Sequence, residues 1–467
     1  MTIVKKIKRK RKRIKRTFSI IKKSNLDFFN KIFRILSWLL PGLVLKRWIV
    51  TSAIGLITSL LGIAIWTNLR PLYWLIETFF WLMTGLTSIF PVSILGPFIL
   101  FIGLLLICLG QNRSINSIQK ALVPQKETLL VDALRVNSKL SRGPNIVAIG
   151  GGTGLSTLLK GLKNYSSNIS AIVTVTDDGG SSGILRKQLG VQPPGDIRNC
   201  LAALSNEEPT LTRLFQYRFS GGGGLEGHSF GNLFLSALTT ITGSLEKAVQ
   251  ASSQVLSVQG QVIPATGIDV MLWAELEDGE KIFGESLIGK SVKPISRIGC
   301  LPENPPALKN AIEAIKEADL IVLGPGSLYT SLLPNLLVPE IVEELLKNNS
   351  PKIYISNLMT QPGETDGLDV YQHIKSIEKQ LFNFGVNTRI FNAILSQGEF
   401  EGSSLIDYYR SRGAEPVICN KKRLVSEGYH VLQAPLYSKR ITPTLRHDSR
   451  RLARAVMYLY KKIKKAS

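Results

Sequence analysis

The residues best suited to chemistry in this sequence lie in two glycine-rich stretches, each of which follows a run of apolar residues. Residues 145–165 read NIVAIGGGTGLSTLLKGLKNY, and residues 168–183 read NISAIVTVTDDGGSSG. A strand, a glycine turn, a helix, a second strand and an acidic turn form the nucleotide sites of many α/β proteins. Glycines let backbone N–H groups approach phosphate, and the helix N-terminus adds a favourable dipole. We therefore expect phosphate contacts from Gly151, Gly152, Thr153, Gly154 and Ser156.

The first glycine turn does not fit the two commonest phosphate-binding motifs. A P-loop needs a lysine directly after its last glycine, whereas Leu155 follows Gly154 here. A dinucleotide fingerprint read from Gly150 would need its third glycine where Leu155 stands. A P-loop ATPase and a nicotinamide oxidoreductase are therefore disfavoured, and the turn indicates a phosphate site of another lineage.

Asp177 and Asp178 end the second apolar run and precede another glycine cluster. An acid at this place often bonds a ribose hydroxyl in dinucleotide folds. Two adjacent acids beside a phosphate site also suit a divalent cation, and Mg²⁺ is the one cofactor that the sequence brings forward. A plain turn with a capping aspartate is the structural alternative. The sequence leaves these readings open.

Four further motifs add hydrogen-bonding side chains: PPGDIRN at 193–199, GHSFGNL at 227–233, GPGSLYTSLLPN at 324–335 and NLMTQPGET at 357–365. Several follow predicted strands, whose carboxyl ends share one edge of a parallel sheet, where ligands bind. In the first motif we expect Asp196 to cap the following helix and Arg198 to reach a phosphate. The binding residues predicted from these motifs are Asp196, Arg198, Asn199, His228, Ser229, Asn232, Gly324, Gly326, Ser327, Tyr329, Thr330, Asn335, Asn357 and Gln361.

These motifs require an α/β frame, and the pattern after residue 144 supplies one. Short β-branched runs alternate with stretches of helical periodicity, which predicts a mostly parallel Rossmann-like sheet with helices on both faces. Asp278 and Gly279 predict a hairpin between 262–277 and 280–287. The predicted strands are 146–149, 169–175, 255–258, 320–323 and 352–356, and the predicted helices are 156–163, 195–204, 305–317 and 339–347.

The net charge of +23 is concentrated at the N-terminus. Residues 1–143 hold 23 Lys and Arg against four acids, which leaves a net charge of +4 for the remainder. A basic arm suits nucleic acid, anionic lipid or a topology signal. Because the excess lies mainly in the arm and the C-terminal tail, we disfavour nucleic acid as a partner. Four cysteines and four histidines without ligand spacing make a zinc site improbable.

Two charge-free apolar stretches of 20 residues, 48–67 and 91–110, follow the basic arm. Each is long enough to span a bilayer. The Lys and Arg before the first stretch predict a cytoplasmic N-terminus, and two spans return the large C-terminal part to the cytoplasm. The aromatic segment 72–90 between them is either a third span or an interfacial segment, which we favour. The sequence thus predicts a multi-pass protein of the plasma (inner) membrane.

Four regions follow from this pattern. We expect a basic cytoplasmic arm at 1–47, a membrane region at 48–110, a linker at 111–143 and a nucleotide-binding domain at 144–467. Neither the oligomeric state nor the downstream partner can be read from the residues, so a homo-oligomer and a partner in cell-envelope synthesis stay open.

Six motifs in this order, GGGTGLS, TVTDDGGSSG, PPGDIRNCL, EGHSFGNL, VLGPGSLYTSLLPNLL and NLMTQPGET, resemble the YvcK family, which is related to the CofD phospholactate transferases. The resemblance covers residue 144 to the C-terminus. The N-terminal region lies outside it and resembles an extension found in membrane-anchored cyanobacterial members. The resemblance implies a Rossmann-like domain that binds a nucleotide-diphosphate compound.

For the YvcK branch, the resemblance implies a gluconeogenesis factor that binds a UDP-sugar such as UDP-N-acetylglucosamine and regulates carbon metabolism, cell shape and envelope synthesis. For the CofD branch, it implies a metal-dependent transfer of a phospho-organic group from a nucleotide-diphosphate donor. The glycine turn carries over as phosphate-binding, and Asp177 and Asp178 carry over as metal or ribose ligands. We favour a non-catalytic nucleotide-sugar regulator and keep the transferase as the alternative.

Overall fold

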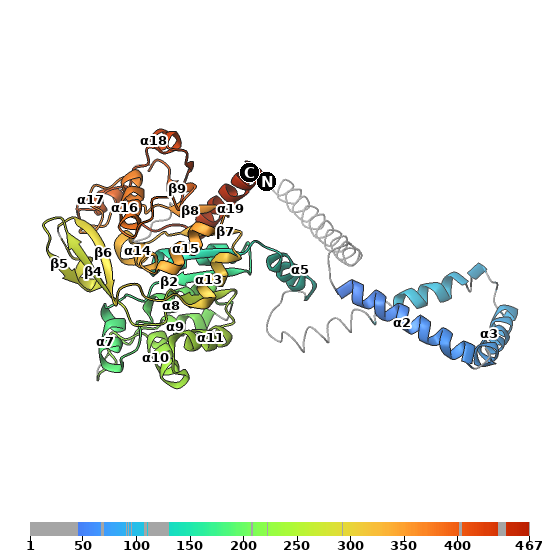
Figure 1. Ribbon diagram of the computed structural model, residues 1–467. Helices are drawn as coiled ribbons and strands as arrows, with labels where there is room; N and C mark the ends of the chain where they lie inside the picture. Colours follow the sequence, from blue (N-terminus) through green and yellow to red (C-terminus); the bar gives the residue numbers. More distant parts are fainter. Residues whose placement is uncertain are drawn as a thin grey trace, which may run out of the picture. The chain divides into compact units, whose positions relative to one another are not determined.

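The computed structural model divides the chain into two compact units, Met1–Ser138 and Lys139–Ser467 (Figure 1). It describes residues 45–66, 70–89, 91, 93–94, 96–106, 110, 130–206, 209–221, 223–291, 293–400, 404–437 and 445–466. Most of the predicted basic arm and most of the predicted linker lie outside these ranges.

The first unit is helical where it is described. Helices α2 (Leu45–Trp66) and α3 (Arg70–Ile89) cover most of the first predicted span and the aromatic segment after it. Across the described residues, no helix has both the length and the apolar character that crossing a membrane requires. The two predicted spans therefore gain no support from the structure, and residues 67, 92, 95 and 107–109 of these spans lie outside the described residues.

A seven-stranded parallel sheet forms the centre of the second unit, in the order β10-β9-β8-β7-β1-β2-β3. Short apolar runs buried on both faces favour such a sheet. Side chains alternate between two cores, with Ile146 and Ala148 facing one and Val147 and Ile149 facing the other. The strands are β1 (Ile146–Gly150), β2 (Ile169–Val173), β3 (Gln261–Pro264), β7 (Leu320–Leu323), β8 (Lys352–Ile355), β9 (Ala393–Gln397) and β10 (His430–Ala434).

Helices cover both faces of this sheet, as the α/β pattern predicts (Figure 1). One core joins the sheet to α6, α8, α11 and α19, and the other joins it to α13, α15 and α16. The helices are α5 (Leu130–Ser141), α6 (Gly152–Leu162), α7 (Gly180–Leu189), α8 (Gly195–Leu204), α9 (Pro209–Gln216), α10 (Phe230–Thr242), α11 (Leu245–Val255), α13 (Lys309–Lys316), α14 (Leu333–Leu336), α15 (Pro339–Lys347), α16 (Val370–Phe382), α17 (Ser404–Arg410), α18 (Lys421–Ser426) and α19 (Ser449–Ala466).

A smaller antiparallel sheet, with strand order β5-β4-β6, is inserted after β3 (yellow in Figure 1). The predicted turn at Asp278 and Gly279 is confirmed, since it joins β4 (Met271–Leu276) to β5 (Lys281–Phe283). The short helix α12 (Glu285–Ile288) leads on to β6 (Ile295–Leu301). The first arm of the predicted hairpin was too long, because residues 261–264 pair with the large sheet as β3.

The strand predicted at 255–258 is wrong. Val255 is the last residue of α11, and Leu256 caps that helix. The strand starts later, after Gly260, whose positive φ of 95° and close approach to the carbonyl oxygen of Ile169 allow the chain to turn into the sheet. The β-branched residues at 255 and 258 favoured a strand, but the helical register of α11 and its packing determine the outcome.

The strand order reverses direction between β1 and β7. From β1 the chain continues to β2 and β3 on one side, and β7 then begins the series β7, β8, β9 and β10 on the other side. The turns after β1 and β7 therefore leave the sheet next to one another and diverge. In open α/β sheets, such a switch point is where ligands bind.

Candidate functional site

The two glycine turns at the switch point pack directly against each other. A Cβ atom at Gly154 would lie 2.2 Å from the carbonyl oxygen of Pro325, so only glycine fits this approach. Asn335 connects the two turns, because its Nδ2 donates to the carbonyl oxygens of Gly150 at 3.2 Å and Ser331 at 2.8 Å. Asn335, which we predicted as a binding residue, is fully buried and thus stabilises the two turns.

Helix α6 begins at this crossing, where Asp196 accepts the Gly152 N–H and the N–H groups of Thr153 and Gly154 can still meet an anion. Its N-cap, Gly151, supplies no side-chain hydrogen bond, and Gly152 adopts a φ of 64°. The first turn of a helix presents N–H groups that have no partner within the helix. Ser156 bonds back to the Thr153 carbonyl oxygen at 3.0 Å, which turns its hydroxyl toward its own helix.

Asp196 lies beside the start of α6. The prediction that it caps its own helix, α8, is wrong. Helix α8 has no side-chain cap, because Asp196 is already its second residue and its carboxylate instead accepts the N–H of Gly152. Burial, with the nearby Asp177 charge, raises the pKa of Asp196 to about 6. The predicted capping aspartate therefore connects α8 to the phosphate-type turn.

A pocket of about 260 Å³ opens on the α6 side of the crossing. Of the predicted residues, it brings together Thr153, Gly154, Gly326, Ser327, Asn357 and Gln361. Asn357 fixes the second turn, since its Oδ1 accepts the N–H of Gly326 at 3.2 Å. The other lining residues are Thr157, Pro325, Leu358, Met359, Thr360, Tyr409, Leu445, Arg446 and His447.

None of these other lining residues was among the predicted binding residues, and three of them carry groups suited to a ligand: Tyr409, Arg446 and His447. Arg446 is exposed and supplies the pocket with a guanidinium group, which suits phosphate. Burial lowers the pKa of His447 to about 4, so its imidazole is neutral at pH 7. The run RHD close after a strand was the available signal, but only the tertiary fold brings it to the glycine turns.

Acidic side chains gather near the same crossing. Asp178 accepts the N–H of Ser286 through Oδ1 at 2.8 Å, and Asp177 accepts the N–H of Gly179 at 3.0 Å. Glu285, which was not predicted from the sequence, is close enough to four other carboxyl groups for their charges to affect it. Burial and the charges of Asp177, Asp196, Asp178 and Glu364 raise its pKa to about 8. The Glu285 carboxyl group is therefore protonated at pH 7.

Glu364 connects the acidic edge to the second glycine turn. Its carboxylate accepts the hydroxyl of Ser327, and its Oε1 accepts the Thr330 hydroxyl at 3.4 Å. Burial raises the pKa of Glu364. Ser327 and Thr330, two predicted binding residues, are thus engaged with an internal acid, and Ser327 additionally lines the pocket.

Mg²⁺ is the candidate cofactor of this edge. Within the described parts of the chain, no three His, Cys, Asp or Glu side chains are grouped as a metal site. Magnesium in nucleotide sites usually takes one or two carboxylates together with phosphate oxygens and waters. The carboxylates of Asp177 and Asp196 fit that donor set, and they would hold the ion only together with a bound phosphate.

His228, Ser229 and Asn232 lie where α10 meets α7, the helix that follows Asp177 and Asp178. Nδ1 of His228 lies 3.0 Å from the Ser181 hydroxyl, and Nδ2 of Asn232 donates to the same hydroxyl at 3.1 Å. Ser229 caps α10 by accepting the N–H of Asn232. These three predicted residues are buried and tie α10 to the start of α7.

The remaining predicted residues are more distant from the pocket. The Arg198 guanidinium donates to Asn199 at 2.9 Å, and burial and the neighbouring Arg218 lower its pKa. Tyr329 packs in the core, with its hydroxyl 3.5 Å from the Ile295 carbonyl oxygen. Gly324 turns the chain after β7 with a φ of 85°.

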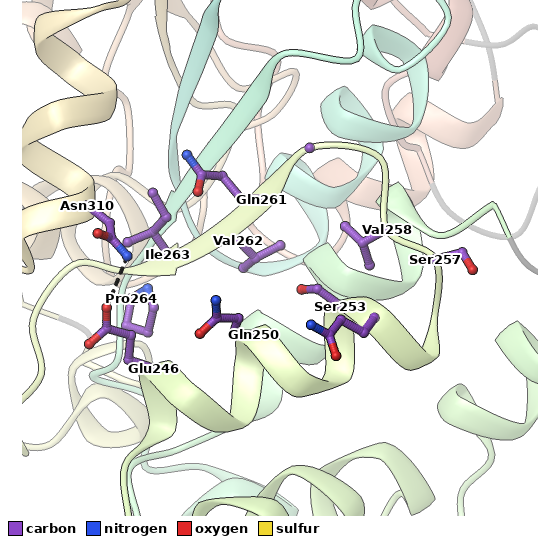
Figure 2. A pocket seen from close by; sticks show the side chains of 12 residues that line it. Glu246, Gln250, Ser253, Ser257, Val258, Gln261, Val262, Ile263, Pro264 and Asn310 are labelled. Carbon is purple, nitrogen blue, oxygen red and sulfur yellow. Dashed lines mark hydrogen bonds between the residues drawn. The ribbon is translucent and has the colours of Figure 1, made fainter. Parts of the chain in front are cut away.

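A second pocket, of about 400 Å³, lies elsewhere, between α11 and the edge strand β3 (Figure 2). Side chains of Gln250 and Ser253 on α11 face the strand, and Glu246 accepts a 3.1 Å hydrogen bond from Asn310 at one end. None of the predicted binding residues lines it. Although it is larger, its lining contains neither Lys nor Arg and none of the predicted motif residues, so we place the functional site at the switch point.

Comparison with known proteins identifies the family to which this chain belongs. The family model described as 2-phospho-L-lactate transferase CofD matches residues 146–437. The chain belongs to the CofD family. Every residue predicted for the site falls in the matched region, whereas Arg446 and His447 lie beyond it. The membership confirms the α/β fold and the CofD relationship expected from the six motifs.

Several members of this family are close in sequence. A Nostoc protein with a provisional gluconeogenesis-factor name is 50% identical over 423 residues, covering 91% of this chain and 92% of that protein. The Bacillus subtilis protein named "Gluconeogenesis factor" is 45% identical over 322 residues, covering 69% of this chain and 100% of that protein. A crystal structure of a UPF0052 family member from Bacillus halodurans has a TM-score of 0.64 at 45% identity and covers 67% of this chain and 99% of that one.

Proposed function

We propose that the second unit binds a nucleotide sugar, a UDP-sugar such as UDP-N-acetylglucosamine, and acts as a gluconeogenesis factor. In this role it regulates carbon metabolism, cell shape and cell-envelope synthesis, in proximity to proteins of envelope synthesis. The observation that carries the binding proposal is the crossing of two glycine turns at the switch point, between a pocket and an acidic edge.

The diphosphate fits the α6 side of the crossing. The N–H groups of Thr153 and Gly154 in the first turn of α6 and the exposed guanidinium of Arg446 supply donors around one pocket. Helix N-termini and arginine side chains both stabilise phosphate oxygens. Tyr409 adds an aromatic ring to the same wall, which suits contact with a base.

The acidic edge fits the sugar. Ionised carboxylates accept hydrogen bonds from hydroxyl groups, and they repel phosphate unless a cation lies between. Asp177 and Asp196 therefore face a neutral, hydroxyl-rich part of the ligand more favourably than its charged part. A protonated Glu285 adds a hydrogen-bond donor to this edge.

The alternative function is a metal-dependent transfer of a phospho-organic group from a nucleotide-diphosphate donor. The description of the family supports it, as does the pair Asp177 and Asp178 beside a phosphate-type turn. Mg²⁺ bound there would neutralise charge on the leaving phosphate.

Calorimetry on the full chain separates the two functions. We expect UDP-N-acetylglucosamine to bind with micromolar affinity and to be recovered intact after incubation with Mg²⁺. Arg446→Gln should weaken binding about tenfold, since a charged hydrogen bond to phosphate contributes about 1.5–3 kcal/mol. Arg412→Gln, on an exposed turn outside the pocket, is the control. Turnover of a nucleotide-diphosphate donor would establish the transferase instead.

The membrane location also stays a proposal. Large apolar side chains are exposed along α2 and α3, including Trp66 at 86% and Trp81 at 77%. Such surfaces mark contacts with membranes or other proteins. Alkaline extraction of cell membranes tests it: an integral protein stays in the pellet, and complete release into the supernatant would refute the two predicted spans.

A further inference from the structure

The C-terminal helix α19 has two different faces. Its apolar side chains, among them Leu452, Val456 and Leu459, are buried in the core shared with α6. The opposite face points outward and carries almost only cations. The exposed residues on it are Arg450, Arg454, Tyr458, Lys461, Lys462, Lys464 and Lys465, which we call the α19 basic face.

These side chains form one continuous stripe. At 100° per residue, their directions fall within about 160° of the helix circumference, and from first to last they extend along about 22 Å of the axis. The helix lies at the outside of the second unit (Figure 1). A stripe of this shape presents its charges to a flat surface together.

The cations of the α19 basic face are not used to stabilise the fold. Among the ion pairs of the described residues, none involves any of the six Lys and Arg side chains of this face. Only Lys464 has side-chain partners among the described residues: the Tyr460 hydroxyl at 3.3 Å, the Tyr460 ring, and the charge of Asp319. Six like charges on 16 residues repel one another, and this cost is relieved when an anionic surface approaches.

We propose that the α19 basic face docks on an anionic lipid bilayer. Lipid headgroups offer dispersed negative charge over a plane, which matches a straight stripe without a groove. Tyr458, 58% exposed in the middle of the stripe, has the amphipathic ring that prefers the headgroup level. The apolar face of α19 is already occupied by the core, so the contact is electrostatic adsorption rather than insertion.

The single sign of its charges distinguishes this face from an ordinary solvated helix surface. Each basic side chain near an anionic bilayer strengthens adsorption about fivefold. A solvated face normally mixes both signs, as on α13, where Lys309 and Lys316 alternate with exposed Glu313 and Glu317. The proposal is independent of the nucleotide site and of the predicted spans, because it needs only the second unit.

A fluorescent probe on α19 in the full chain tests the proposal. Tyr458→Cys is labelled with an environment-sensitive dye in a background in which Cys108 and Cys419 are replaced by serine, since Cys200 and Cys300 are buried. We expect a blue shift with vesicles containing phosphatidylglycerol and none with pure phosphatidylcholine. The shift should be lost in 0.5 M NaCl, where the Debye length falls to about 4 Å.

Two charge-reversed variants with the same net charge decide whether α19 itself makes the contact. The test variant is R450E/R454E/K461E/K462E, and the matched control is K309E/K316E/K379E/K421E, which changes exposed lysines outside α19. We expect at least a tenfold weaker lipid response in the test variant and an unchanged one in the control. If the reversed helix does not fold by circular dichroism, the glutamine version of the same four positions replaces it.

Three results would overturn the proposal. One is the absence of a phosphatidylglycerol-dependent shift at position 458. Another is an equal response of the test variant and the control, which would assign binding to net charge or to the N-terminal arm. The last is loss of the vesicle response when an acidic protein or a nucleic acid is added at equimolar amount, which would identify a macromolecular partner for this face.

Discussion

At the scale of the residue, the crossing of the two glycine turns depends on a missing side chain. Replacing Gly154 with alanine would push a Cβ atom against the backbone carbonyl of Pro325, from which it would be 2.2 Å away. Because backbone cannot yield as a flexible side chain does, we expect Gly154→Ala to lower the free energy of unfolding by about 1–3 kcal/mol. Urea unfolding followed by circular dichroism measures this change.

Gly221 supplies the control for this substitution, since a Cβ atom there has nothing within 4 Å and its φ is not in the left-handed region. Gly221→Ala should change the free energy of unfolding by less than about 1 kcal/mol. Equal effects at the two positions would show that the close approach of the turns contributes little to stability.

Glu285 gives the acidic edge a dependence on pH. Its pKa is about 8 in the folded protein and about 4.5 when unfolded, so between these values the folded state holds a proton that the unfolded state releases. The contribution of this carboxyl group to stability is therefore full below pH 4.5 and is lost as the pH rises through 8.

Glu285→Gln removes that contribution, and comparison of melting temperatures measures it. We expect the melting temperature of Glu285→Gln, relative to the unsubstituted protein, to rise by at least about 2 °C between pH 5 and pH 9. Glu313→Gln, on the exposed side of α13, should give a constant difference over the same range. A constant difference for Glu285→Gln as well would contradict the raised pKa.

At the scale of the element, α12 is fixed to the large sheet from two sides. Asp178, after β2, accepts the N–H of Ser286, and Gly284 lies so close that a Cβ there would be 2.3 Å from Asp178 Oδ2. On the other side, Gly363 lies against the Ser291 carbonyl oxygen. The segment 284–291 is therefore held by the Asp178 carboxylate after β2 and by Gly363 after β8, and these contacts position Glu285.

Asp178→Ala should release α12 while leaving the strands around it intact. Losing an acceptor for a backbone N–H costs about 1–2 kcal/mol locally, which corresponds to roughly tenfold faster amide hydrogen exchange at residues 284–288. Asp269→Ala is the matched control, because it breaks the exposed ion pair with Arg186 at 2.9 Å near the same insertion. Unchanged exchange at α12 in Asp178→Ala would show that Gly363 alone holds it.

The elements also show which parts of the structure could be predicted from the sequence. Strands such as 146–149 and 320–323 were found because each is an apolar β-branched run buried on both faces, and the helices 195–204 and 339–347 have the predicted bounds. Strands β9 and β10 were not found: β10 is only half buried and its pattern is weak, whereas β9 is fully buried but ends in the polar residues Ser396 and Gln397. The order of the sheet, set by contacts across many residues, is not visible in any local pattern.

The candidate site was predictable to a similar extent. Glycine turns have strict local requirements, so Gly151 to Gly154 and Gly326 were identified from their spacing. Glu285 and Arg446 have no local motif, because their roles come from an inserted sheet and from the chain after β10. His228 and Asn232 were identified as polar residues in a glycine-bounded segment, but their hydrogen bonds are with Ser181 of the neighbouring turn.

At the scale of the whole molecule, the end of α5 belongs to the second unit. Ser167 donates its N–H to the Leu140 carbonyl oxygen at 3.0 Å, and Nδ2 of Asn168 donates to the carbonyl oxygens of Ser141 at 3.1 Å and Gly143 at 2.9 Å. These bonds lie directly before β2. The boundary predicted at residue 144 would remove the acceptors of all three.

A fragment of residues 130–467 should therefore be more stable than one of residues 144–467. Three hydrogen bonds, each partly exposed, correspond to about 1–3 kcal/mol in the free energy of unfolding. Urea denaturation of both fragments measures the difference, and UDP-N-acetylglucosamine binding to the full chain and to the longer fragment supplies the control. We expect the two affinities to agree within about threefold, since every lining residue of the pocket lies after residue 152. If the full chain binds and the longer fragment does not, the first unit contributes to the site; if the two fragments are equally stable, α5 is a linker as its sequence suggested.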